Sequence, residues 1–72
     1  MPALLDHKKL CKEMSEQALT QETLAERAGI SDRHLRNLRS RDTNVSMSLL
    51  YSISAALRVP MDELVVLQED RE

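Results

Sequence analysis

Apolar residues recur along this chain with the 3.6-residue period of amphipathic helices. The N-terminal segment has one apolar arc at 100° per residue, formed by Leu4, His7, Leu10, Cys11, Met14 and Ala18. This arc predicts a first helix over roughly residues 3–17.

A second pattern repeats four times: an aliphatic residue, a capping position, and a leucine four residues after the cap. It occurs as Leu19-Thr20…Leu24, Ile30-Ser31…Leu35, Val45-Ser46…Leu50 and Val59-Pro60…Leu64. Each occurrence resembles a hydrophobic staple around an N-cap, although Pro60 cannot supply a capping hydroxyl. The four starts predict helices over roughly residues 21–28, 32–40, 47–57 and 61–67. Since no stretch alternates with period two, no strand is expected, and the fold class is all-α with five helices.

The chain is predicted to form a single domain over residues 1–72, because it is short and contains no repeat or low-complexity tract. The polar C-terminal tail, residues 68–72, is expected to fray. No run approaches the roughly 18 apolar residues that a membrane span requires, and the N-terminus lacks the pattern of a secretory signal. We therefore expect a soluble, cytoplasmic protein without a membrane partner.

The charge of the chain is unevenly distributed. Ten Lys and Arg against twelve Asp and Glu give a net charge of −2, which by itself argues against a nucleic-acid partner. Residues 27–41, however, contain five arginines and one acid, a net charge of +4, so the rest of the chain carries −6. This basic segment is either a solvated helix face or a contact surface for nucleic acid.

The order of small and apolar residues in segment 21–40 predicts a helix-turn-helix. The inner faces of the two short helices are formed by Leu24, Ala25 and Ala28, and by Ile30, Leu35 and Leu38. Gly29 allows the left-handed conformation that ends a helix sharply, so that only a three-residue bend remains before the second helix. Two helices joined so tightly cross at a steep angle, and the second projects outward.

The outer face of the second helix carries Asp32, Arg33, Arg36, Asn37 and Ser40. These side chains suit the base edges of the major groove: arginine can donate to guanine, asparagine pairs with adenine, and aspartate accepts from cytosine.

The stretches LTQETLAERAGIS and SLLYSISAALRVPMDEL resemble the Cro/cI-type (XRE family) helix-turn-helix repressors, over about residues 8–67. This resemblance implies a compact five-helix lambda-repressor-like domain that binds operator DNA as a homodimer. It implies base reading by Asp32, Arg33, Arg36 and Asn37. It also implies contacts to the DNA backbone by Thr20, Gln21, Ser31, Ser40, Arg41 and Thr43.

The sequence departs from this family in two places. Where the family usually has an arginine in its first helix and a glutamate at the end of its recognition helix, this chain has Met14 and Arg39. Because both partners of that ion pair are replaced, we expect Arg39 to extend to solvent or to phosphate. A glycine is also missing after the recognition helix, so Ser40, Asp42 or Asn44 is expected to form the turn through side-chain hydrogen bonds.

Other chemistry is not indicated. The lone Cys11 excludes an internal disulfide or a Cys-based zinc site, and both it and His7 are expected to pack in the core. His34 either contacts phosphate or faces water. No catalytic constellation is present, so no enzyme activity, cofactor, metal or small-molecule ligand is expected.

The C-terminal aliphatic residues exceed what one face of a two-turn helix can bury, and Tyr51 falls off the core arc beside Met47. We therefore expect a two-fold dimer interface formed by Tyr51, Val65, Val66 and Leu67.

These observations predict a sequence-specific regulator of transcription that binds double-stranded DNA, as a dimeric repressor of phage, plasmid or mobile-element type. The alternative is a protein-interaction module, such as an antitoxin or anti-regulator, with weak or no DNA binding. Affinity for random duplex that falls steeply with salt favours the first interpretation.

Overall fold

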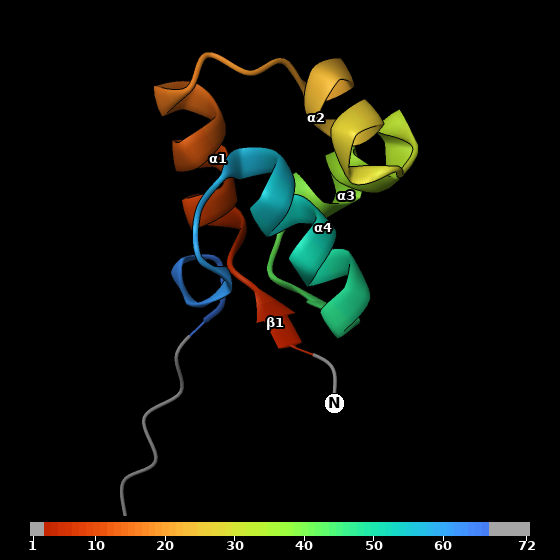
Figure 1. Cartoon of the computed structure of the whole chain (residues 1–72). Coiled ribbons are helices and arrows are strands. Elements are labelled where there is room, and N and C mark those ends of the chain that lie inside the picture. The colour runs from red at the N-terminus through yellow and green to blue at the C-terminus, as the bar shows by residue number, and fades with distance from the viewer. Residues whose placement is uncertain (1–2, 67–72) are drawn as a thin grey trace, which may run out of the picture.

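Four α-helices, one 3₁₀ turn and a small antiparallel sheet form the computed structural model, which describes residues 3–66 (Figure 1). In chain order the elements are β1 (Ala3–Leu5), α1 (His7–Glu16), α2 (Gln21–Ala28), α3 (Asp32–Ser40), β2 (Thr43–Val45), α4 (Met47–Leu57) and the 3₁₀ turn η1 (Met61–Glu63). Helices α2 and α3 lie together on one side of the molecule, and β1 lies at the other end beside the first turn of α4 (Figure 1). None of the described helices is long and apolar enough to cross a membrane.

The predicted hydroxyl caps are confirmed at the starts of three helices. Thr20, Ser31 and Ser46 each accept a hydrogen bond from the backbone N–H three residues later, at 3.0 to 3.1 Å. Each cap satisfies one of the backbone donors that a helix N-terminus leaves without an intrahelical partner. Helices α2, α3 and α4 therefore begin where the staple pattern predicts.

Three helices end in a left-handed residue. Gly29, which follows α2, has φ of 74°, as the sequence predicts, but Ala18 and Arg58 adopt the same conformation after α1 and α4, with φ of 55° and 60°. In all three cases the next residue donates its N–H to a carbonyl five positions back, at 2.9 to 3.1 Å: Leu19 to Met14, Ile30 to Ala25 and Val59 to Ser54. This is the Schellman motif. The aliphatic residue that precedes each following cap therefore also closes the helix before it.

The prediction of a first helix over residues 3–17 is wrong at its start. Residues 3–5 form β1, which pairs antiparallel with β2 so that Ala3, Leu4 and Leu5 face Val45, Asn44 and Thr43. Asp6 then caps α1 by accepting from the N–H groups of Lys8 and Lys9. The strand was missed because a three-residue strand is too short to display alternation, and its partner lies about forty residues away.

The fifth predicted helix, residues 61–67, is also wrong. After the single turn η1, Val65 bridges Leu5 in antiparallel fashion and Val66 donates its N–H to the carbonyl of Leu4 at 2.9 Å. The chain thus returns to β1 instead of continuing as a helix. Leu67 and the tail 68–72 lie outside the described residues.

The core lies between all four helices and the sheet, and aliphatic side chains dominate it. Nine large side chains are less than 2% exposed: Leu5, Leu10, Leu24, Leu35, Leu38, Leu50, Ile53, Leu57 and Leu64. Met14 is 4% exposed, whereas Cys11 and His7, predicted as core residues, are only partly buried. This core fixes the orientation of α3, whose Leu35 and Leu38 are both part of it.

Candidate nucleic-acid interface

Helix α3 is held by its inner face and exposes the opposite one. Leu35 and Leu38 are 0% and 1% exposed, while Asp32, Arg33, Arg36 and Asn37 are all exposed. Arg33, Arg36 and Asn37 are spaced at i, i+3 and i+4, so they share one side of the helix. Within residues 3–66 their side chains make no hydrogen bond or ion pair to protein, which leaves their donors available to a ligand.

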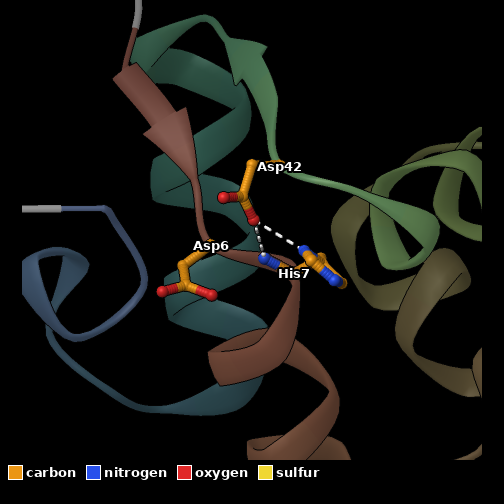
Figure 2. Close-up of side chains that lie close together, drawn as sticks. All are labelled: Asp6, His7 and Asp42. Atoms are coloured by element: carbon orange, nitrogen blue, oxygen red, sulfur yellow. Dashed lines mark hydrogen bonds and ion pairs between the residues drawn. The ribbon is translucent and has the colours of Figure 1, made fainter.

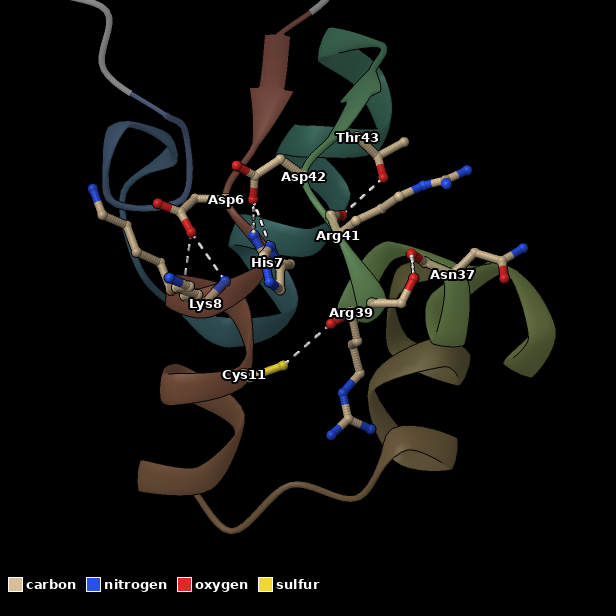
Figure 3. A network of polar contacts seen from close by, with 11 residues as sticks. Asp6, His7, Lys8, Cys11, Asn37, Arg39, Arg41, Asp42 and Thr43 are labelled. Carbon is tan, nitrogen blue, oxygen red and sulfur yellow. Dashed lines mark hydrogen bonds and ion pairs between the residues drawn. The ribbon is translucent and has the colours of Figure 1, made fainter.

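The residues that the sequence assigned to the DNA backbone fall into two groups. Thr20, Gln21 and Ser31 lie at the N-termini of α2 and α3, where free backbone N–H groups and the helix dipole favour an anion. Ser40, Arg41 and Thr43 lie at the exit of α3. The hydroxyls of Ser40 and Thr43 donate to the carbonyls of Asn37 and Arg41, at 2.8 and 3.0 Å, and the side chain of Arg41 extends outward (Figure 3).

Arg39 does not extend to solvent as expected. Its side chain is partly buried and runs from the end of α3 into the region between α1 and α2 (Figure 3). There Nη1 donates to Oε1 of Gln21 at 2.8 Å, and no acid pairs with it among the described residues. Nε2 of Gln21 in turn donates to the carbonyl of Asp32 at 3.4 Å. Sequence reasoning missed this link, because the two side chains come from different helices.

The loop after α3 is fixed by a second contact that sequence reasoning missed. Oδ1 of Asp42 accepts from the backbone N–H of His7 at 3.1 Å and lies 2.6 Å from Nδ1 of the same residue (Figure 2). The hydrogen bond from the His7 side chain is the main cause that lowers the pKa of Asp42 below its usual 3.8. Of the three residues expected to form this turn by side-chain bonds, Ser40 caps the end of α3, while Asp42 anchors the loop to α1.

Asp6, His7 and Asp42 bring three metal-ligating atoms within 4.8 Å of one another. Hydrogen bonds already account for this cluster, since Asp6 caps α1 through the N–H groups of Lys8 and Lys9. The positive end of the α1 dipole also opposes a cation at this point. We assign the cluster to helix capping.

The arrangement of α2, α3 and their exposed polar faces agrees with the comparison to known families. A helix-turn-helix family model matches residues 8–64. The chain belongs to the Cro/cI-type helix-turn-helix family. Membership of this family supports a DNA-binding transcription regulator and points away from an enzyme. No curated protein sequence matches the chain significantly.

Solved structures share the fold. The restriction-modification controller protein C.AhdI from Aeromonas hydrophila has a TM-score of 0.74 and 24% identity, over 79% of this chain and 86% of that one. A 2-hydroxyethylphosphonate dioxygenase variant has a TM-score of 0.77 and 25% identity, over 93% of this chain. PhpD, solved with cadmium, has a TM-score of 0.72 and 24% identity, also over 93% of this chain. This chain spans only 16% and 14% of the two latter proteins, so their likeness concerns one small domain of each.

This helix-turn-helix domain has apolar side chains outside its core. Tyr51 and Met47, one turn apart on α4, are 64% and 46% exposed. Met47 also lines an apolar hollow of about 240 Å³, together with Ala3, Leu50, Met61, Asp62 and Val65. Val65 and Val66 are partly buried, and Leu67, the last of the expected interface residues, lies outside the described part of the chain.

Proposed function

We propose that this protein is a sequence-specific, double-stranded DNA-binding repressor of transcription that reads its operator with α3. The observation that carries this proposal is the unpaired polar face formed by Arg33, Arg36 and Asn37. Arginine can donate two hydrogen bonds to guanine O6 and N7 in the major groove, which is wide enough to admit a helix. Asparagine can donate to adenine N7 and accept from the adenine N6 amino group. Asp32, at the exposed start of α3, adds an acceptor for cytosine.

The backbone contacts proposed for this complex lie on both sides of α3. Thr20, Gln21 and Ser31 would bind phosphate near the helix N-termini, and Ser40, Arg41 and Thr43 would bind it at the exit of α3. Such contacts fix the register of a protein on DNA without reading sequence, whereas the α3 face supplies the specificity.

We also propose that the protein binds as a two-fold dimer. The exposed pair Tyr51 and Met47 supports this, together with Val65 in the adjacent apolar hollow, because contiguous apolar surface of this kind is typical of an interface. The proposed interface also includes Val66 and Leu67. A dimer would require an operator with two half-sites about 10 base pairs apart, arranged as a palindrome.

Selection of bound sequences from a random duplex library tests these proposals together. We expect enrichment of a palindromic site, and an affinity for it that exceeds the affinity for random duplex by at least roughly a thousandfold. Binding to random duplex should weaken steeply as salt rises, because phosphate contacts release counterions. No enrichment together with no binding to random duplex at low salt would overturn the proposal in favour of a protein-interaction module.

A further inference from the structure

We propose that Arg39 is a positioning residue for DNA binding: it fixes the side-chain amide of Gln21 so that its NH₂ group faces the phosphate. This inference rests on the proposed function and assigns a role to a residue that would not itself contact DNA. It starts from the hydrogen bond between Nη1 of Arg39 and Oε1 of Gln21, at 2.8 Å.

The charge of Arg39 decides which way the Gln21 amide points. A glutamine amide has a carbonyl that only accepts and an NH₂ group that only donates, and the two are similar in shape. With a guanidinium at Oε1, the reversed orientation would direct two donors at each other. The NH₂ group is therefore held on the far side, where one N–H reaches the carbonyl of Asp32. The second N–H is left for an acceptor at the start of α2, which is where a phosphate oxygen would lie.

The stability of the free domain does not explain this position of Arg39. A cation beside the N-terminus of α2 faces the positive end of the helix dipole, which is unfavourable. In addition, Nε of Arg39 is buried without a hydrogen-bond partner within the described structure. A phosphate bound at the same helix N-terminus would be attracted by the charge that is otherwise unfavourable there. The position of the charge is therefore accounted for if the arrangement serves an anionic ligand.

The same link couples phosphate binding to base reading. Asp32 and Arg39 are the first and the eighth residues of α3, and the Gln21 side chain contacts both. A phosphate held by Gln21 would therefore fix α3 in the groove at its N-terminal end and its last turn together. Loss of Arg39 should weaken binding to every sequence alike, and not at one base pair.

A double-mutant cycle tests the proposal. The full chain, Arg39→Met, Gln21→Ala and the double variant are titrated with a random-sequence duplex at about 50 mM salt and at several higher concentrations. We expect each single variant to lose roughly tenfold in affinity, as for a hydrogen bond to a charged group. The double variant should also lose roughly tenfold and not roughly a hundredfold, because both changes remove one coupled contact. The salt slope of Arg39→Met should stay close to that of Gln21→Ala, because the proposal gives Arg39 no direct phosphate contact.

Controls separate positioning from charge and from folding. Lys12→Met removes one exposed positive charge on α1 and should change affinity by less than about twofold. Arg39→Lys, which keeps a positive charge and N–H donors, should recover part of the lost affinity, and circular dichroism checks that each variant is folded. In the free protein, the two Nε2 proton resonances of Gln21 should move in Arg39→Met but not in Lys12→Met.

The outcomes distinguish this inference from the function on which it rests. If the unchanged protein fails to bind duplex at low salt, the proposed function is wrong. If it binds but the two losses are additive, and the salt slope of Arg39→Met is smaller than that of Gln21→Ala by about 0.9, then Arg39 contacts phosphate directly and the positioning role is overturned.

Discussion

Replacing Ala18 by glycine is expected to stabilise the domain, although glycine usually weakens a helical protein. Ala18 has φ of 55°, in the left-handed region where the Cβ of an L-residue crowds the backbone carbonyl oxygen. Its side chain is exposed, so no buried contact is lost. Its N–H donates to the carbonyl of Ser15 at 3.1 Å, and a glycine keeps this bond. Only the conformational free energy of the backbone changes.

The size of the gain follows from two opposing terms. The left-handed conformation costs an L-residue roughly 1–2 kcal/mol. Glycine avoids this cost, but about 0.5–1 kcal/mol of the gain is lost because glycine increases the conformational entropy of the unfolded chain. The net stabilisation is therefore roughly 0.5–1 kcal/mol, against a total of about 4–10 kcal/mol for a domain of this size. At about 4–8 °C per kcal/mol, Tm should rise by roughly 2–8 °C.

Thermal and urea unfolding followed by circular dichroism measures this change. Ala55→Gly is the matched control, because Ala55 is also exposed but lies inside α4, where the same substitution should cost about 1 kcal/mol. The two variants should therefore move Tm in opposite directions. If Ala18→Gly lowers Tm as much as the control does, α1 does not end in a left-handed residue and the reasoning is wrong.

Three further predictions concern the surface contacts. Since the pKa of Asp42 is lowered in the folded protein, its bond to His7 contributes stability above pH 3.8 that is lost as pH falls below this value. Asp42→Asn should therefore flatten the acid limb of a plot of Tm against pH. An unchanged acid limb contradicts the contact. Arg36→Ala should cost about 1–3 kcal/mol on the selected operator and relax preference at one base pair; an equal loss on random duplex contradicts base reading. Tyr51→Glu should shift sedimentation toward a monomer, whereas Ser48→Glu, also exposed on α4, should not; equal behaviour of the two variants refutes the proposed interface.

The helices that the sequence predicted well are those whose signals are local. Thr20, Ser31 and Ser46 each lie between an aliphatic residue and a leucine four residues later, and each makes its capping bond as expected. Because these interactions join residues within one turn, the order of residue types is enough to predict them. The same holds for the α3 face, whose exposed and buried positions follow from helical periodicity alone.

The elements that were mispredicted depend on partners far away in the chain. Leu4 fits a helical arc, and Val65 and Val66 fit a short helix, yet β2 and the C-terminal segment both bond to β1. Such pairing is decided by tertiary contacts, which override local preference in segments of only a few residues. A left-handed helix end was also predicted only where a glycine signals it, and for this reason the left-handed residues Ala18 and Arg58 were missed.

The replacement of an ion pair by Met14 and Arg39 illustrates the limit of reasoning from pairs of residue types. Sequence comparison explained why no acid is needed at position 39, and Met14 is indeed buried. Arg39 was nevertheless expected to extend away from the core, because only the loss of the family's ion pair was considered. The nearby amide of Gln21 accepts from the guanidinium instead, so the charge stays beside the start of α2. A change that looks like simple removal of a salt bridge therefore moves a cation to the helix end that is proposed to bind phosphate, and its effect should appear in DNA affinity more than in stability.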